Sequence, residues 1–496
     1  MNAVNYKYTL LTIFFSLLIC QGFSQVKIVW STTIDGKGSF SSPRVSDLNG
    51  DGVKDIVFGA GRNPFIALDS AVIALDGKTG AILWVAPSND QMFGSPSFMD
   101  ISGDGVEDIF INGRSGILKV LDGKNGRLIW EFLPGYSPQE ARDEGWYNFY
   151  NPQFVEDVDN DGVKDILISS GGDVLVAANN PDRPIGLLVV ISGKHGKLIA
   201  KAEVPDGKET YLSVVTYSIG DNNNPNIIYG TGGETISGSL YITTLNDVLK
   251  GDLSNSTRIA HGGTKGFIAP PVMADITDDG KLDIIAMAVD GRMIAIDGDT
   301  KSELWSVGLK STEAFTSMAV GRFNSDTTPD FFAVVNTGIW PTMEYAISLV
   351  VDGKSGQIIK SDTVGYFQMV SPIAFDIDNN EFDEVLLHTN IPTHDPVEKT
   401  KYVNILLLFD FKNRITQRLG PVFQGAKQAS TPWIGDLDND GILDVVMLYQ
   451  KDVYNWSIFG GIDIIRLDLG IKMQRNVTWG SYMGSYYDGI YRDNRE

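Results

Sequence analysis

The chain has 496 residues, of which 43% are hydrophobic and 21% charged, so it carries enough apolar material for a folded core. Its 40 Lys and Arg against 62 Asp and Glu give a net charge of -22, which disfavours sequence-independent binding to nucleic acid or to anionic lipid. The 53 glycines, with short apolar runs between glycine-rich turns, are typical of many short strands. The first expectation is therefore an all-β fold.

The N-terminal segment predicts export. Residues 10–20 form an apolar run, and Gly22 and Ser24 are small residues suited to cleavage after position 24. We expect residues 1–24 to be a secretory signal peptide; acylation at Cys20 is an alternative that the larger residue before it disfavours. Cys20 is the only cysteine, so the processed chain has no disulfide. The expected location is the periplasm, the cell surface or the exterior, as a monomer with no transmembrane segment after signal removal.

A nine-residue acidic pattern recurs along the chain. Its first copy is Asp-Leu-Asn-Gly-Asp-Gly-Val-Lys-Asp, and two further windows, residues 218–226 and 322–330, keep its flanks but lose most of its acids. The starts lie roughly 50 to 60 residues apart, which is the length of one supersecondary repeat. The first copy is residues 47–55; close copies start at Asp100, Asp157, Asp275 and Asp436, and a looser one runs from Asp376 to Glu384.

Each repeat offers four short strands. One precedes the acidic loop, one follows it, and a strand-turn-strand element such as residues 72–84 completes the unit, which is the make-up of a propeller blade. Eight units fill residues 25–496 as a single closed β-propeller, with seven blades as the alternative. We expect the segment around Val29 and Trp30 to pair with residues 464–479, because closure removes an exposed sheet edge.

Two family resemblances support a propeller. The acidic loop followed by Ile-Val-Phe-Gly-Ala-Gly resembles the FG-GAP repeat of integrin α-subunit propellers and of many secreted bacterial proteins. Residues 74–84 are similar to the tryptophan-docking motif of the eight-bladed quinoprotein (PQQ-like) propellers, which implies that Trp84, Trp130 and Trp305 wedge between blades. Both resemblances concern architecture, and unrelated activities share these folds.

The acidic loops predict about six calcium sites. Calcium takes six to eight oxygen ligands, and alternate side chains at loop positions 1, 3, 5 and 9 plus a backbone carbonyl supply them. Solvated turns built from the same residues are the alternative. The expected ligands are Asp47, Asn49, Asp51, Val53 (carbonyl) and Asp55; Asp100, Ser102, Asp104 and Asp108; Asp157, Asp159, Asp161 and Asp165; Asp275, Thr277, Asp279 and Asp283; Asp376, Asp378, Asn380 and Glu384; and Asp436, Asp438, Asp440 and Asp444.

The two degenerate loops should bind no calcium. Residues 218–226 have no carboxylate at a ligand position, and Arg322 at the first position of the other loop could pair with Asp326 or Asp330 in place of an ion.

The long irregular segments all fall on the propeller face opposite the acidic loops, where binding residues would concentrate. The expected ligand-binding residues on that face are aromatic with one acid, although such rings could equally fill the central space: Trp146, Tyr147, Phe149, Tyr150, Glu234, Trp340, Tyr345 and Trp456.

The expected function is a binding or scaffold module for a glycan or a protein partner. The alternative is an extracellular carbohydrate-active enzyme of the polysaccharide-lyase kind, but the histidines His195, His261, His388 and His394 show no catalytic or metal-ligand spacing, and we predict no catalytic residue. Quinone dehydrogenase activity is disfavoured, because the vicinal disulfide that the quinoprotein resemblance implies cannot form without cysteines.

Overall fold

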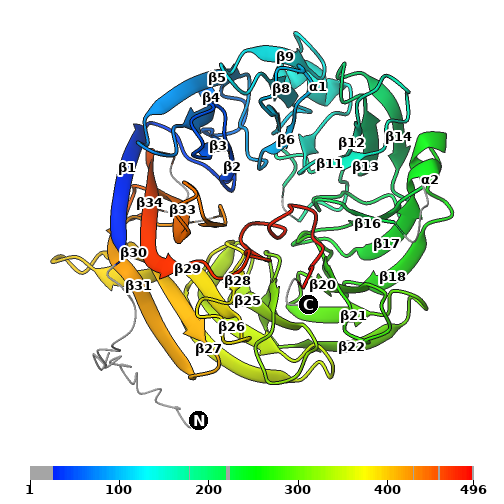
Figure 1. The fold of residues 1–496 in the computed structure, drawn as a ribbon. Helices are drawn as coiled ribbons and strands as arrows, with labels where there is room; N and C mark the ends of the chain where they lie inside the picture. The colour runs from blue at the N-terminus through cyan, green and yellow to red at the C-terminus, as the bar shows by residue number, and fades with distance from the viewer. Residues whose placement is uncertain (1–25, 178, 219–223, 428, 456–458, 494–496) are drawn as a thin grey trace.

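The computed structural model describes residues 26–177, 179–218, 224–427, 429–455 and 459–493; the predicted signal peptide and Trp456 lie outside these ranges. The described residues form 34 strands and two short helices. The strands group into eight antiparallel blades arranged as a ring (Figure 1). Each blade has four strands, except that the first strand of blades 3 and 6 is split into two short strands that pair with the same neighbour. A single residue pair, Tyr366 opposite Asn390, joins two of the blades into a larger sheet. The all-β, eight-bladed prediction is confirmed.

We number the blades by their acidic loops. Blades 1–4 comprise β2 (Arg44–Ser46), β3 (Asp55–Gly59), β4 (Leu68–Leu75), β5 (Ile82–Ser88); β6 (Ser97–Met99), β7 (Asp108–Asn112), β8 (Leu118–Leu121), β9 (Leu128–Glu131); β10 (Asn148–Phe149), β11 (Gln153–Val155), β12 (Asp165–Gly171), β13 (Leu187–Ile191), β14 (Leu198–Glu203); and β15 (Val215–Tyr217), β16 (Asn226–Gly230), β17 (Ser239–Thr244), β18 (Thr257–His261).

Blades 5–8 follow in the same order around the ring. They comprise β19 (Val272–Ala274), β20 (Asp283–Met287), β21 (Arg292–Ile296), β22 (Glu303–Gly308); β23 (Thr312–Glu313), β24 (Ala319–Gly321), β25 (Asp330–Ile339), β26 (Thr342–Val351), β27 (Ile358–Tyr366); β28 (Ile373–Phe375), β29 (Glu384–His394), β30 (Thr400–Asp410), β31 (Ile415–Gln424); and β32 (Trp433–Gly435), β33 (Ile442–Gln450), β34 (Gly461–Lys472), β1 (Lys27–Asp35).

Burial explains the order of strands within a blade. The second strand, β3 (Asp-Ile-Val-Phe-Gly), is buried at every residue because neighbouring blades cover both of its faces. The outermost strand β5 alternates between exposed and buried residues, because only one of its faces packs against a neighbour. The hydrophobic core is accordingly a series of clusters between adjacent blades.

The ring closes through strands from the two ends of the chain. β1 pairs antiparallel with β34 from Lys27 opposite Asp468 to Asp35 opposite Gly461, so the N-terminal strand is the outer strand of blade 8. The predicted pairing is confirmed for the residues of β34, whereas Trp479 lies elsewhere.

Tryptophans link successive blades, as the sequence predicted. Four indoles on outer strands each donate Nε1–H to a glycine carbonyl in the β-turn of the next blade, at 2.8 to 3.0 Å. A second turn glycine, three residues on, lies against each ring. The donor, carbonyl and ring-contact residues are Trp30, Gly77 and Gly80; Trp84, Gly123 and Gly126; Trp130, Gly193 and Gly196; and Trp305, Gly353 and Gly356.

Two helices interrupt the strand pattern. Helix α1 (Pro138–Asp143) starts with a capping box between Ser137 and Glu140. Helix α2 (Leu245–Lys250) joins β17 to β18, and its Leu245 and Val248 pack in one cluster with β13 and β14 of blade 3. This helix therefore covers a blade junction that has no docking tryptophan.

The C-terminal segment, residues 473–493, crosses the centre of the ring (Figure 1) and was not expected from the sequence. It bonds inner strands of several blades: Ala374 N–H to the Trp479 carbonyl, Ile434 N–H to Gly480, Met273 N–H to Gly489, each at 2.9 Å, and Trp479 Nε1–H to Met318 at 3.1 Å. The Arg44 guanidinium of blade 1 lies 3.9 Å from the Tyr487 ring centroid. The segment thus ties the blades together on their axis.

Gly126→Ala should loosen the junction of blades 1 and 2. A Cβ at Gly126 would lie 2.5 Å from Trp84 Cε3, and the residue has φ +71°, so we expect a loss of about 2–4 kcal/mol in unfolding free energy. Gly135→Ala is the control, because Gly135 has φ +82° but no atom within 4 Å, and should cost about 1 kcal/mol. Urea unfolding followed by circular dichroism measures both; equal losses would contradict the docking role of Trp84.

Trp479→Ala should destabilise the whole ring. Trp479 is 1% exposed and contacts two blades, so truncation is expected to cost about 3–5 kcal/mol. Tyr486→Ala in the same segment is the control, since Tyr486 is 67% exposed. Scanning calorimetry should show a large drop in melting temperature for the first variant alone; a drop of the same size in both would show that the segment does not brace the axis.

Candidate functional site

The acidic loops and the β-turns lie on one face of the ring. In blade 1 the Asp47 carboxylate accepts the Gly50 N–H at 2.8 Å, and Asp55 accepts the N–H groups of Leu48 in its own loop and Gly77 in the turn between β4 and β5, both at 2.9 Å. The last carboxylate of the loop therefore ties the two loops of the blade together, which confirms that they share a face.

The last acidic position is buried in every one of the predicted calcium loops. Burial raises the pKa of Asp55 to about 6 and that of Glu384 to about 9. Glu384 Oε1 has no hydrogen-bond partner among the described residues. Buried carboxylates so close to other acids need a cation or a proton to offset their desolvation. Ligand atoms of three acids lie within 4.8 Å of one another in three loops: Asp157, Asp159 and Asp165; Asp376, Asp378 and Glu384; and Asp436, Asp438 and Asp444.

An arginine side chain from β34 pairs with the acidic loop of blade 8. Arg466 on β34, with a side chain only 4% exposed, pairs through Nε with Asp444 at 2.8 Å and through Nη2 with Asp438 at 2.5 Å. Both carboxylates are among the predicted calcium ligands. The guanidinium pairs with both of them in this structure, so calcium in the loop from Asp436 to Asp444 stays a prediction and is left out of the proposal below.

The ion pair predicted for Arg322 forms with a different partner. Its Nη2 pairs with Asp493 of the C-terminal segment at 2.5 Å, and not with Asp326 or Asp330. Asp330 instead accepts the Phe323 N–H at 3.0 Å. Most of the other degenerate loop, residues 219–223, lies outside the described residues.

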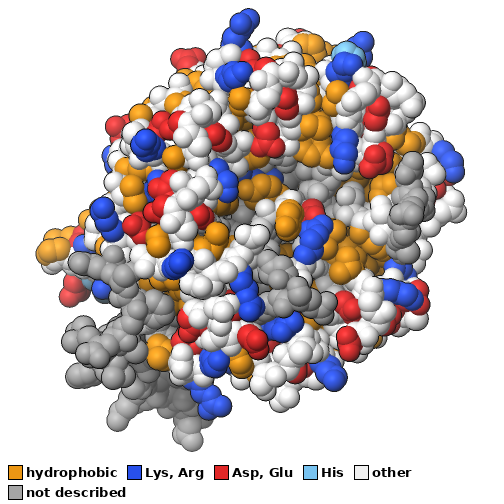
Figure 2. Space-filling view, in the orientation of Figure 1, with side chains coloured by type: hydrophobic (Ala, Val, Ile, Leu, Met, Phe, Trp, Pro, Cys, Tyr) orange, Lys and Arg blue, Asp and Glu red, His pale blue; other side chains and the backbone are white. Residues whose placement is uncertain are grey.

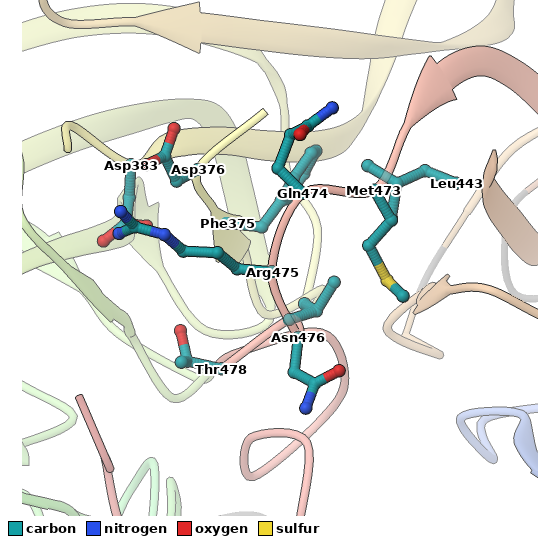
Figure 3. Close-up of a pocket in the computed structure, with 10 residues that line it drawn as sticks. Phe375, Asp376, Asp383, Leu443, Met473, Gln474, Arg475, Asn476 and Thr478 are labelled. Carbon is teal, nitrogen blue, oxygen red and sulfur yellow. The ribbon is translucent and has the colours of Figure 1, made fainter. Parts of the chain in front are cut away.

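The C-terminal segment also covers the blade 7 loop. Figure 3 shows Arg475 extending toward Asp376 and Asp383, with Met473 beside Leu443. The cavity between them has a volume of only about 20 Å³, room for a water molecule at most. This cavity is packing space and not a ligand site.

Basic and acidic side chains are interspersed over the face drawn in Figure 2.

The larger cavity opens on the axis at the opposite face and has a volume of about 470 Å³. We call it the axial mouth. Every blade contributes a residue from the segment that leads into its inner strand, and Tyr482 of the C-terminal segment also lines the cavity. The residues from blades 1 to 8 are Phe40, Phe93, Tyr150, Tyr211, Ile268, Phe315, Met369 and Ser430, and Trp340 and Glu234 join them from the loops between second and third strands.

A chain of hydrogen bonds links six of the eight blades at the mouth, from blade 7 through blades 8 and 1 to blade 4. Each link joins a backbone or amide N–H of one blade to a side-chain oxygen of the next, at 2.7 to 3.3 Å. It holds the aromatic residues at fixed positions. The links run from Ser371 to Thr431, Thr431 to Ser42, Ser42 to Ser95, Ser95 to Asn151 and Asn151 to Ser213.

Three of the predicted ligand-binding residues, Tyr150, Glu234 and Trp340, line the mouth. Trp146 and Phe149 do not: they are 7% and 0% exposed and pack in one cluster with Phe132, so we withdraw them as ligand contacts.

The other predicted residues are also away from the mouth. Tyr147 is half-buried and not among its lining residues, and Tyr345 is 53% exposed on β26. The sequence analysis missed Phe40, Phe93, Tyr211 and Phe315. A repeated aromatic residue two positions before a Ser, as in Phe40-Ser41-Ser42 and Phe93-Gly94-Ser95, could have identified all four of them.

The phenols at the mouth are hydrogen-bond donors. Burial raises the pKa of Tyr150 and Tyr211 far above the usual range, and the nearby Glu209 and Glu234 add to the effect. Both side chains therefore stay neutral at physiological pH. Aromatic faces with fixed O–H groups suit a ligand that has both apolar and polar surface.

The family model described as "Outer membrane protein assembly factor BamB" (PQQ_2) matches residues 27–307, more than half of the chain. The chain belongs to this family. The match supports the quinoprotein-type resemblance of the repeats; the integrin-type resemblance stays an expectation. The matched region runs from β1 to β22 and includes the four docking tryptophans.

Other relatives are more distant. The chain is 22% identical over 366 residues to human Protein FAM234B, covering 67% of this chain and 54% of that protein, so it spans about half the length of this curated relative. Two solved structures share the fold: quinohemoprotein alcohol dehydrogenase from Comamonas testosteroni (TM-score 0.56, 12% identity, 91% of this chain and 78% of that chain) and a europium-containing methanol dehydrogenase (0.57, 11%, 90% and 93%).

The mouth does not fit the quinone cofactor after which the family model is named. Pyrroloquinoline quinone is a tricarboxylate, and a site for it needs several cationic partners. Among the described lining residues the charged side chains are Arg114 and Glu234, one of each sign. We therefore derive no quinone chemistry for this chain.

Proposed function

We propose that this protein is an exported, calcium-stabilised scaffold that binds a segment of a partner protein in the axial mouth. The observation that carries the proposal is the mouth itself: seven aromatic side chains line a cavity of about 470 Å³, and a chain of hydrogen bonds links six of the blades that carry its lining. Rigid aromatic anchors with polar tips are typical of protein-binding surfaces, because they bury a large area at little cost in side-chain entropy.

The family favours a protein over a glycan. Its description concerns the assembly of outer membrane proteins, which is a task of protein recognition. A glycan ligand is the other outcome of the test below. No helix in the described part of the chain is long and apolar enough to cross a membrane.

The carbohydrate-active enzyme has less support. The described residues that line the mouth include no histidine. His388 is fully buried on β29, where its Nε2 lies against Asn404 Oδ1 at 2.5 Å, as expected for a structural histidine.

We also propose calcium in the acidic loops of blades 1, 2, 3, 5 and 7. The support is the repeated set of alternate oxygen donors around a buried carboxylate, which is the donor chemistry of a hard cation. With a dissociation constant of ~0.1 mM and ~1 mM calcium, each site adds on the order of 1.4 kcal/mol to the unfolding free energy.

Asp51→Asn should remove one calcium ion. Asp51 is exposed and its Oδ1 accepts the Val53 N–H at 2.9 Å, a bond that the Asn oxygen keeps while the charge is lost. Asp326→Asn is the matched control: Asp326 accepts the Thr328 N–H at 3.0 Å in the degenerate blade 6 loop. Equilibrium dialysis with metal analysis should show one ion fewer for the first variant only. A melting temperature of the unaltered protein that EDTA leaves unchanged would refute calcium stabilisation.

Trp340→Ala should abolish most partner binding. Trp340 lines the mouth and packs with Phe315 and Phe367, at centroid distances of 5.7 and 6.1 Å. Screening the unaltered protein on peptide and glycan arrays, then measuring hits by interferometry, should give peptide hits that this variant weakens at least tenfold. Tyr345→Ala, off the mouth, should leave them unchanged. Glycan hits alone, or peptide hits equally strong in both variants, would contradict the proposal.

A further inference from the structure

One wall of the axial mouth combines aromatic rings with a carboxylate. The Tyr150 ring lies between those of Phe93 and Tyr211, at centroid distances of 5.6 and 6.1 Å. Gly233 approaches Tyr211 so closely that a Cβ there would lie 2.8 Å from the ring. This contact sets Glu234, the next residue, beside the two phenols.

The charged groups around this wall already have partners. Arg183 Nη1 lies 3.4 Å from Glu209 Oε2, and both side chains are nearly inaccessible, at 6% and 1% exposed. Arg142 pairs with Asp173 at 2.7 Å. These four charges cancel in pairs.

The remaining cations near the wall are also occupied. Lys265 Nζ pairs with Glu313 at 2.5 Å and bonds the backbone oxygen of Glu234, not its carboxylate, at 2.6 Å. Arg114 donates Nε–H to Gln91 Oε1 at 2.7 Å. The Arg114 guanidinium carbon also lies 5.4 Å from the centroid of the Phe93 ring.

The Glu234 carboxylate differs from these charged groups because it has no ion pair in the described part of the chain. Among the residues that the structure describes, none donates a side-chain hydrogen bond to it or forms an ion pair with it, and it lines the mouth half-buried. We infer that Glu234 receives a cationic side chain, lysine or arginine, of the partner protein, whose aliphatic stem packs against Phe93, Tyr150 and Tyr211. This inference rests on the proposed function and names the chemistry of its ligand.

The physical basis is charge complementarity at a partly desolvated site. A carboxylate in a half-buried cavity attracts a cation more strongly than one in bulk water, because the local dielectric is lower. The π faces beside it attract the same cation, while repelling an anion. A neutral isostere of lysine would keep the packing and lose both attractions.

The test uses small probes and a carboxylate-neutralising variant. Nα-acetyl-lysine methylamide and its arginine, norleucine and glutamate counterparts are titrated by saturation-transfer NMR. We expect the two cationic probes to bind the unaltered protein at least tenfold more tightly than the norleucine probe. Glu234→Gln should remove that difference without changing norleucine binding. Glu144→Gln, an exposed glutamate in a loop of the same face, should preserve it. Matching melting temperatures verify that all variants are folded.

Each result decides between the two proposals. Equal binding of lysine and norleucine probes, no binding of the lysine probe, or a preference that survives Glu234→Gln overturns the role of Glu234. If peptides from the array still bind and still lose affinity with Trp340→Ala, the mouth remains the binding site and the cationic recognition alone is refuted.

Discussion

The antiparallel pairing of β1 with β34 is the interaction on which the rest of the structure depends. A ring of eight sheets has no closed core until its first and last blades meet, and this pairing joins residues more than 400 positions apart. It also places Trp30 against the turn of blade 1, so the tryptophan series continues across the closure. The C-terminal segment then adds a second constraint, on the axis, where it bonds inner strands on several sides. The stability of a chain predicted to lack disulfides after processing therefore comes from closure and from contacts between neighbouring blades.

The two faces of the ring follow from blade geometry. Loops between first and second strands and between third and fourth strands share one face, so short acidic loops and tight turns gather there, and Asp55 can bond both. Segments that enter the inner strands lie at the opposite end of the axis, and their first residues converge because the blades are wedge-shaped around it. Convergence brings one residue from each repeat, aromatic in five of the eight, to the wall of a single cavity. The acidic loops and the mouth therefore lie on opposite faces as a direct consequence of the strand order within each blade.

Much of the fold was predictable because it depends on local, repeated patterns. The acidic nonapeptides mark the turn after each inner strand, and the resemblance of residues 74–84 to the tryptophan-docking motif implied that Trp84 lies between blades, where its indole bonds Gly123. The candidate site was less predictable. Aromatic density selected Trp146 and Phe149, but these rings pack beneath their own loop, whereas the weaker pattern around Phe40 and Phe93 marked residues at the mouth. A high density of aromatic residues in a segment indicates that the segment is apolar. Whether a given ring faces the mouth or packs beneath its loop depends on the position of the residue in the blade.

The sequence by itself determined the blade type, favoured eight blades over seven, and identified three of the four docking tryptophans and the acidic loops, because each depends on residues within one repeat or on the period between repeats. Only the tertiary structure decided how residues of distant repeats meet. It placed Arg466 on Asp438 and Asp444, Arg322 on Asp493, and the C-terminal segment on the axis. It also left the Glu234 carboxylate in the mouth without an ion pair among the described residues. These outcomes depend on distances across the closed ring, and no local pattern encodes them.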